Sequence, residues 1–183
     1  MRAADIPDQI TQVLATEEEI QAKLAEIAAR VASDYDGEDL LLVGVLKGAV
    51  MVMADFARAL PMVVPMDWMA VSSYGDGTRS RGVVQIRKDL DTDINDKHVL
   101  IVEDIIDSGL TLSWLLENFA SRGAKSVEVF ALFRKPDAAK IAVDCRYVGF
   151  DIPNEFVIGY GLDYAERYRN LRDVAVLAPH VYS

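Results

Sequence analysis

The chain has 183 residues, of which 51% are hydrophobic and 26% charged, the profile of one globular domain with a substantial core. Its formal net charge of −10 argues against a nucleic-acid partner, because binding to phosphate backbones relies on clustered Lys and Arg. The apolar runs are too short for a membrane span, and the first residues lack the features of a signal peptide. We therefore expect a cytoplasmic protein with a small-molecule partner and no membrane partner.

Cysteine and histidine are too scarce to account for a function. The single cysteine, Cys145, excludes an intramolecular disulfide, and two histidines, His98 and His180, are too few for a His/Cys zinc site. The acidic excess is compatible with a hard metal ion, but solubility explains it more simply. The chain carries no internal repeat, low-complexity tract or flexible linker, so we expect residues 1–183 to form a single domain.

The first element predicted along the chain is a helix that begins at Thr16. Thr16 and Glu19 have the spacing of a capping box, in which each side chain satisfies a free backbone donor. Apolar residues then recur at helical spacing, at Ile20, Leu24, Ile27 and Val31. The Asp36-Gly37 turn signal ends the helix.

Short apolar runs bounded by turn residues predict five strands after this helix. They cover residues 40–46, 63–72, 99–103, 127–133 and 156–160. Helices are predicted over 49–60, which Pro61 ends, and from Leu112 to Phe119, with Gly123 beyond the helix end. Strands that alternate with helices and lack polar positions are typical of a mainly parallel sheet covered on both faces. The sequence therefore predicts an α/β fold with a central sheet flanked by helices.

In such sheets ligands bind beyond the carboxyl ends of the strands, so the residues there are the candidates for chemistry. The segment 99–112, VLIVEDIIDSGLTL, combines a buried strand, an acidic pair, a loop of small residues and a helix start. Such a loop presents backbone N–H groups at the positive end of a helix, which suits one phosphate. Ser108 and Thr111 can add hydroxyl donors, and Gly109 lets the backbone come close. A solvated helix cap would explain the Asp-Ser-Gly turn alone, but not the whole segment.

Two adjacent acids, Glu103 and Asp104, precede this loop and would repel each other without a cation or hydroxyl donors nearby. With them, the segment resembles the phosphoribosyl pyrophosphate signature of the type I phosphoribosyltransferases. The resemblance implies that Glu103 and Asp104 bind the ribose hydroxyls and take part in holding Mg²⁺. It implies that Asp107 is the general base for the purine N7. The 5′-phosphate would be wrapped by Asp107, Ser108, Gly109, Leu110 and Thr111.

Two further stretches narrow the resemblance to the hypoxanthine-guanine enzymes. Lys47 and Gly48, in the segment GVLKGA, resemble the pyrophosphate loop of these enzymes, in which the Leu46–Lys47 bond can be cis; alone, the lysine is an ordinary surface residue. Arg169 would also contact pyrophosphate. The polar stretch 72–82 reads alone as a loop or hairpin tip, and it resembles the lid, in which Ser73 and Tyr74 close on the reacting centre and exclude water.

The expected purine site comes from the last third of the chain. Lys135 follows a predicted strand and resembles the donor to the purine 6-oxo group, which would select hypoxanthine or guanine over adenine. In the segment 153–164, PNEFVIGYGLDY, the resemblance implies that Phe156 stacks on the purine, Val157 offers backbone groups and Asp163 ligates Mg²⁺. Without the resemblance, Lys135 would be a surface lysine and Phe156 a core residue. Adenine, orotate and uracil phosphoribosyltransferases are not expected to combine Lys135 with Asn154-Glu-Phe-Val157.

The resemblance covers residues 40–171 and implies a Mg²⁺-dependent enzyme of purine salvage. It would transfer the phosphoribosyl group from phosphoribosyl pyrophosphate to hypoxanthine and guanine, and it would form a homodimer or homotetramer. The implied fold is the type I phosphoribosyltransferase fold with a small hood subdomain, to which the helix region 1–36 and the segment 150–183 would contribute. Two alternatives stay open: an enzyme that prefers xanthine, and a regulatory RNA-binding protein of the same fold, which would need a basic surface.

Overall fold

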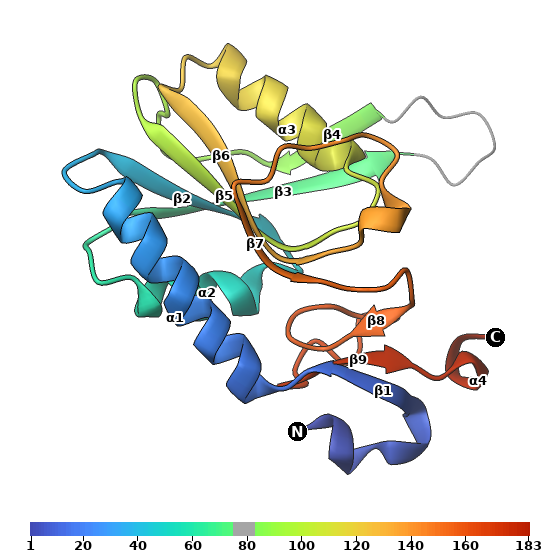
Figure 1. Ribbon diagram of the computed structural model, residues 1–183. Helices are drawn as coiled ribbons and strands as arrows, with labels where there is room; N and C mark the ends of the chain where they lie inside the picture. The colour runs from blue at the N-terminus through green and yellow to red at the C-terminus, as the bar shows by residue number, and fades with distance from the viewer. Residues whose placement is uncertain (75–82) are drawn as a thin grey trace.

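The computed structural model of the protein describes residues 1–74 and 83–183. Two β-sheets build this part of the chain (Figure 1). The larger sheet has the strand order β4-β3-β2-β5-β6-β7 and the smaller one the order β1-β9-β8. The larger sheet consists of β2 (Leu40–Leu46), β3 (Met66–Tyr74), β4 (Val83–Lys88), β5 (His98–Ile106), β6 (Ser126–Arg134) and β7 (Tyr147–Asp151). Only the β3–β4 pair is antiparallel, so this is the mainly parallel central sheet that the sequence predicts.

Helices cover both faces of the central sheet. Successive residues of a strand point to opposite faces, and along β2 Leu42 packs with one cluster while Leu41 and Val43 pack with the other. The helices α1 (Glu17–Asp34) and α2 (Val50–Ala59) lie on the first face, and α3 (Leu110–Ser121) lies on the second (Figure 1). The apolar strands are therefore buried on both sides, as predicted.

The predicted capping box starts α1. The Thr16 hydroxyl accepts a hydrogen bond from the Glu19 N–H, and Glu19 Oε2 accepts one from the Thr16 N–H at 2.8 Å. The predicted apolar stripe of this helix is fully buried, from Ile20 to Val31. None of the helices in the described ranges has the length and apolar character needed to cross a membrane.

The smaller sheet joins the two ends of the chain and forms the hood. It pairs β1 (Ile10–Ala15) with β9 (Val174–Leu177), and β9 with β8 (Val157–Ile158), all antiparallel. The strand predicted over 156–160 is wrong in length and place, because only two of its residues are extended and they pair outside the central sheet. Four short elements complete the described fold: η1 (Ala3–Asp5), η2 (Pro7–Gln9), η3 (Pro136–Ala138) and α4 (Pro179–Tyr182).

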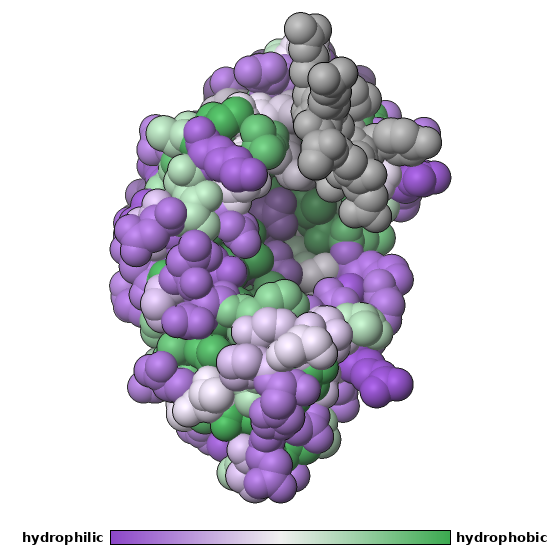
Figure 2. Space-filling model, turned by 90° about the vertical axis from the view of Figure 1, so that its right-hand side faces the viewer, coloured by the Kyte–Doolittle hydropathy of each residue, from purple (hydrophilic) through white to green (hydrophobic). Residues whose placement is uncertain are grey.

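The carboxyl ends of the parallel strands lie toward the right of Figure 1, where η3 follows β6 and the hood lies below. Figure 2 views the molecule from that side and shows a hollow between its upper and lower parts, bordered by hydrophilic and hydrophobic residues. The candidate site is built from the segments that meet there.

Candidate active site

The loop between β5 and α3 lines a pocket of about 150 Å³. The pocket walls are Glu103, Ile105, Ile106, Asp107, Ser108, Gly109, Thr111 and Leu112. Gly109 precedes the first residue of α3 with a left-handed φ of 78°, and a Cβ there would lie 2.6 Å from the carbonyl oxygen of Ile141. Only glycine therefore fits this turn without strain. The first N–H groups of a helix have no partner within it, so the start of α3 offers donors to an anion.

The two acids at the end of β5 both have a pKa above the usual value. Burial raises the pKa of Glu103 well above its usual value, and the neighbouring Asp104 raises it further. Burial also raises the pKa of Asp104 to about 6, although hydrogen bonds from backbone N–H groups and the charge of Arg169 oppose the rise. The Glu103 residue is only 8% exposed. A cation or several hydroxyl donors beside these carboxyls would favour their ionised form.

The side chains of these two acids point to opposite sides of β5, as those of consecutive strand residues do. Glu103 lines the pocket of the loop between β5 and α3. Asp104 faces Gly48, where a Cβ would lie 1.8 Å from Asp104 Oδ2. A Cβ on Gly161 would in turn lie 2.0 Å from the Gly48 carbonyl oxygen. Three segments thus meet here: the loop after β2, the end of β5 and the hood. They approach so closely that a side chain at either glycine would clash.

The predicted pyrophosphate residues lie next to this contact. The peptide bond between Leu46 and Lys47 is cis, a conformation that could not be determined from the sequence. Lys47 Nζ lies 3.0 Å from Glu166 Oε2, and Arg169 Nη2 lies 2.8 Å from Asp163 Oδ1 and 3.4 Å from Glu166 Oε2. The structure therefore brings Lys47 and Arg169 to one place and pairs both with acids of the hood.

Sequence reasoning missed Glu166 as a member of this group. Its position depends on a turn in which Ala165 and Glu166 both have positive φ values, 51° and 62°. Non-glycine residues rarely adopt this conformation, and neither alanine nor glutamate is a residue type that would predict it. The Glu166 N–H also donates to Asp163 Oδ2 at 2.9 Å, which fixes the turn. An acid midway between Asp163 and Arg169 was the only available signal.

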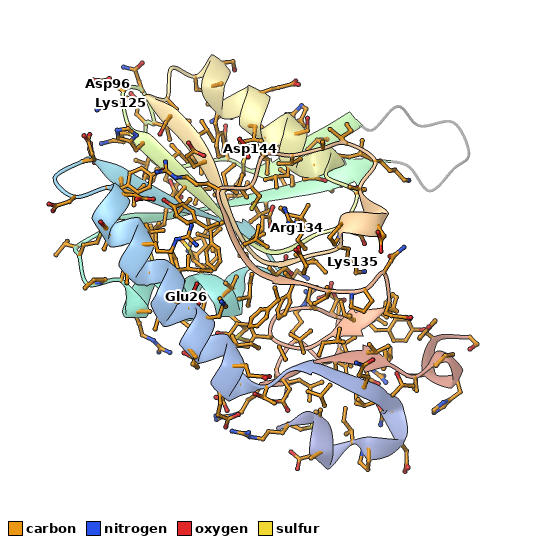
Figure 3. The ribbon with its side chains drawn as sticks, viewed as in Figure 1. Glu26, Asp96, Lys125, Arg134, Lys135 and Asp144 are labelled. Atoms are coloured by element: carbon orange, nitrogen blue, oxygen red, sulfur yellow. The ribbon has the colours of Figure 1, made fainter. Side chains whose placement is uncertain are left out.

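The predicted base and the predicted purine-reading lysine face each other. Lys135 Nζ lies 3.4 Å from Asp107 Oδ2, and the Lys135 N–H donates to the Ile106 carbonyl oxygen at 2.9 Å. Lys135 is 8% exposed, so it is not the surface lysine that its isolated position in the sequence would suggest. Figure 3 shows it between the end of the central sheet and the hood.

The hood supplies the remaining predicted purine residues. Phe156 is 40% exposed, so it is not a core residue, and Val157 is buried and begins β8. Ser73 and Tyr74 end β3. Residues 75–82, which make up most of the predicted lid, lie outside the described residues. Within the described ranges, no three His, Cys, Asp or Glu side chains are grouped so that they could hold a metal by themselves. Glu103, Asp104 and Asp163 thus do not form a closed metal site.

Comparison with known proteins gives one consistent family. The model of the phosphoribosyl transferase domain matches residues 10–165. The chain is 55% identical over 182 residues to the hypoxanthine-guanine phosphoribosyltransferase of Mycobacterium bovis, a match that covers 96% of this chain and 90% of the relative. It is 51% identical to the enzyme of the same name from Bacillus subtilis, with 94% of this chain and 96% of the relative covered.

Solved structures agree with the sequence matches. A hypoxanthine phosphoribosyltransferase from Staphylococcus aureus superimposes with a TM-score of 0.94 at 45% sequence identity, covering 98% of this chain and 97% of that one. Identity at this level over nearly the whole length goes beyond a shared fold. The chain therefore belongs to the phosphoribosyltransferase family, and within it to the hypoxanthine-guanine phosphoribosyltransferases.

Proposed function

We propose that this protein transfers the phosphoribosyl group of phosphoribosyl pyrophosphate to hypoxanthine and guanine in purine salvage, releasing pyrophosphate and the nucleoside monophosphate. The observation that carries the proposal is the close approach of buried Lys135 to Asp107, which itself lines the pocket of the β5–α3 loop. A lysine and a carboxylate at this position suit a purine that accepts a hydrogen bond at its 6-oxo group and loses a proton from its ring.

The reaction requires one bond to form and one to break at the ribose anomeric carbon. The purine N9 forms the new bond while the bond to pyrophosphate breaks and its electrons leave with the oxygen. The sugar becomes cation-like between these events, so nearby carboxylates stabilise it. Glu103 and Asp104 supply that charge at the end of β5, and the loop 107–111 holds the 5′-phosphate at the start of α3.

Asp107 takes the proton that the purine must lose. Its carboxylate projects from the phosphate loop toward Lys135, so one residue can link phosphate binding to proton transfer at N7. General base catalysis of this kind contributes roughly 10²- to 10⁴-fold to a rate. Lys135 donates to the 6-oxo group, Phe156 covers the purine face and Val157 offers backbone groups to the purine edge.

The donor set fits Mg²⁺, which prefers oxygen ligands and is commonly held by one or two carboxylates together with substrate phosphates. Burial and the nearby Asp163 carboxyl both raise the pKa of Asp104, so a cation beside Asp104 would favour its ionised form. Asp104 and Asp163 are therefore the proposed direct ligands, together with substrate oxygens, and Glu103, on the opposite side of β5, would contribute through the ribose hydroxyls that it binds. When bound, the ion would neutralise charge that grows on the leaving pyrophosphate.

We further propose that the whole chain acts as one domain and as a homodimer or homotetramer, with Ser73 and Tyr74 in the lid. Strand β1 pairs in the hood and leads directly into α1 on the central sheet, which ties the two parts together. Exposed apolar side chains at Val63 and Met66 offer a contact surface. Light scattering coupled to size exclusion measures the assembly directly.

The function is tested by following pyrophosphate release from phosphoribosyl pyrophosphate with hypoxanthine, guanine, xanthine or adenine. We expect turnover with hypoxanthine and guanine, loss of turnover with a chelator, and recovery with added Mg²⁺. Turnover with xanthine alone would show that xanthine, and not hypoxanthine or guanine, is the substrate. Absence of turnover with every 6-oxopurine would refute the proposed reaction.

A further inference from the structure

The C-terminal turn of the chain packs an aromatic side chain against the proposed purine-stacking ring. Phe156 and Tyr182 are stacked, with ring centroids 5.0 Å apart and an interplanar angle of 28°. Tyr164 meets Phe156 edge-on at 5.8 Å and lies 6.3 Å from Tyr182. Three aromatic residues from separate parts of the hood therefore form one cluster.

Backbone hydrogen bonds fix the terminal segment relative to Phe156. The Leu177 N–H donates to the Phe156 carbonyl oxygen at 2.9 Å, and the Ala178 N–H donates to the Gln9 carbonyl oxygen at 2.8 Å. In α4 itself, the Val181 N–H donates to the Ala178 carbonyl oxygen at 3.0 Å. The side chain of Val181 packs on the small apolar core of the hood. Tyr182 is thus carried by an anchored turn of the chain.

The cluster leaves part of the Phe156 ring open. Although Tyr182 stacks on it and Tyr164 meets it edge-on, Phe156 remains 40% exposed. An exposed phenylalanine without such neighbours could occupy several rotamers, and a ligand that stacks on it would have to order the ring. A ring already backed by a second aromatic loses that freedom before the ligand arrives.

We propose that Tyr182 is a positioning residue for purine binding, which backs the Phe156 ring and presents its open surface to the base. The inference rests on the proposed function, because it requires Phe156 to stack on a purine. Tyr182 acts through Phe156 and needs no contact with the substrate. Its effect should therefore be confined to the purine and spare phosphoribosyl pyrophosphate.

The test compares steady-state kinetics of Tyr182→Ala, Tyr182→Phe and the unchanged protein. An aromatic pair contributes enough to change an equilibrium about two- to tenfold, so the KM for hypoxanthine should rise about that much in Tyr182→Ala. The KM for phosphoribosyl pyrophosphate should stay unchanged, and Tyr182→Phe, which keeps the ring, should restore the purine KM. His180→Ala, in the same turn of chain, is the matched control and should behave as the unchanged protein. If Tyr182→Ala does not fold, Tyr182→Leu removes the ring while keeping apolar bulk.

The outcomes separate this inference from the proposed function. If the unchanged protein turns over hypoxanthine but Tyr182→Ala has the same purine KM, the positioning role is wrong and the reaction stands. Equal rises in both KM values would assign Tyr182 to general stability of the hood. A lower purine KM would mean that Tyr182 covers the surface that the purine needs. If the unchanged protein has no turnover with any 6-oxopurine, the proposed function and this inference fail together.

Discussion

Lys135 Nζ and Asp107 Oδ2 lie 3.4 Å apart, at the carboxyl ends of the neighbouring parallel strands β6 and β5. Without a substrate, each residue masks the group that the other would use. The positive charge of Lys135 partly neutralises the Asp107 carboxylate, and this carboxylate engages an N–H of Lys135 that a 6-oxopurine would accept from. A purine that enters between them would accept from Lys135 at its 6-oxo group and give a ring proton to Asp107. Substitutions of the two residues should therefore have different kinetic signatures.

Replacing Asp107 by asparagine should lower kcat strongly while leaving the binding of phosphoribosyl pyrophosphate mostly intact. The amide keeps the shape of the loop but cannot take the purine proton, so kcat should fall by roughly 10²- to 10⁴-fold. Single-turnover kinetics and calorimetric binding of phosphoribosyl pyrophosphate measure the two quantities. Equal losses of binding and rate would instead assign Asp107 to the phosphate cradle.

Replacing Lys135 by alanine should weaken binding of the purine and leave binding of phosphoribosyl pyrophosphate unchanged. A hydrogen bond from a charged donor is worth enough to change binding by about tenfold or more. The measurement is the KM for hypoxanthine, with Lys140→Ala as a control at a nearby exposed lysine. An unchanged purine KM would contradict the assigned contact.

Replacing Gly161 by alanine should destabilise the protein and weaken pyrophosphate binding. The new Cβ would lie 2.0 Å from the Gly48 carbonyl oxygen, so the loop after β2 must move. Gly37→Ala is a matched control, because Gly37 also has a positive φ, 76°, but has no neighbouring atom within 4 Å of the built Cβ. Thermal unfolding should show a larger loss for Gly161→Ala than for Gly37→Ala. Equal losses would mean that backbone strain alone, and not the loop contact, requires glycine at residue 161.

The stability of the protein without ligands should depend on the ionisation of Asp104. Its pKa is about 6 in the folded protein, above its ordinary value of 3.8, so the folded state binds more protons than the unfolded state between these pH values. The free energy of unfolding contributed by this group therefore falls as the pH rises from about 4 to about 6. Asp104→Asn should make that decline shallower and raise stability above pH 6, as measured by urea unfolding without Mg²⁺. Parallel pH profiles for the two proteins would contradict the raised pKa.

Strands β2, β5 and β6 could be predicted from sequence because they are largely buried on both faces and read as apolar runs, whereas the edge strand β4, which alternates partly buried and exposed residues, and strand β7 were not predicted. The capped start of α1 at Thr16 is equally local. Strand β1 could not be predicted, because its burial does not alternate and its pairing depends on β9, far along the chain. Strand β7 includes Gly149, where a Cβ would lie 2.4 Å from the Leu132 carbonyl oxygen, so close packing rather than strand propensity selects this residue.

The candidate site divides in the same way. Lys135 and Asp107 could each be predicted as site residues because both follow the carboxyl end of a strand, where ligands bind in parallel sheets. The pairing of Lys47 with Glu166 follows from no such rule, because it needs a left-handed turn in the hood. The cluster around Phe156 likewise required the position of the C-terminus, which no local pattern in the sequence predicts.

The ratio of kcat/KM for hypoxanthine to that for adenine tests the central claim most directly. Adenine carries an amino group where the 6-oxo group accepts, so buried Lys135 would face a donor instead of an acceptor. Sites built around such a hydrogen bond reject the wrong partner by roughly 10⁴-fold, and we predict a ratio of that order. Comparable values for the two bases, or a preference for adenine, would contradict the claim that Lys135 reads the 6-oxo group.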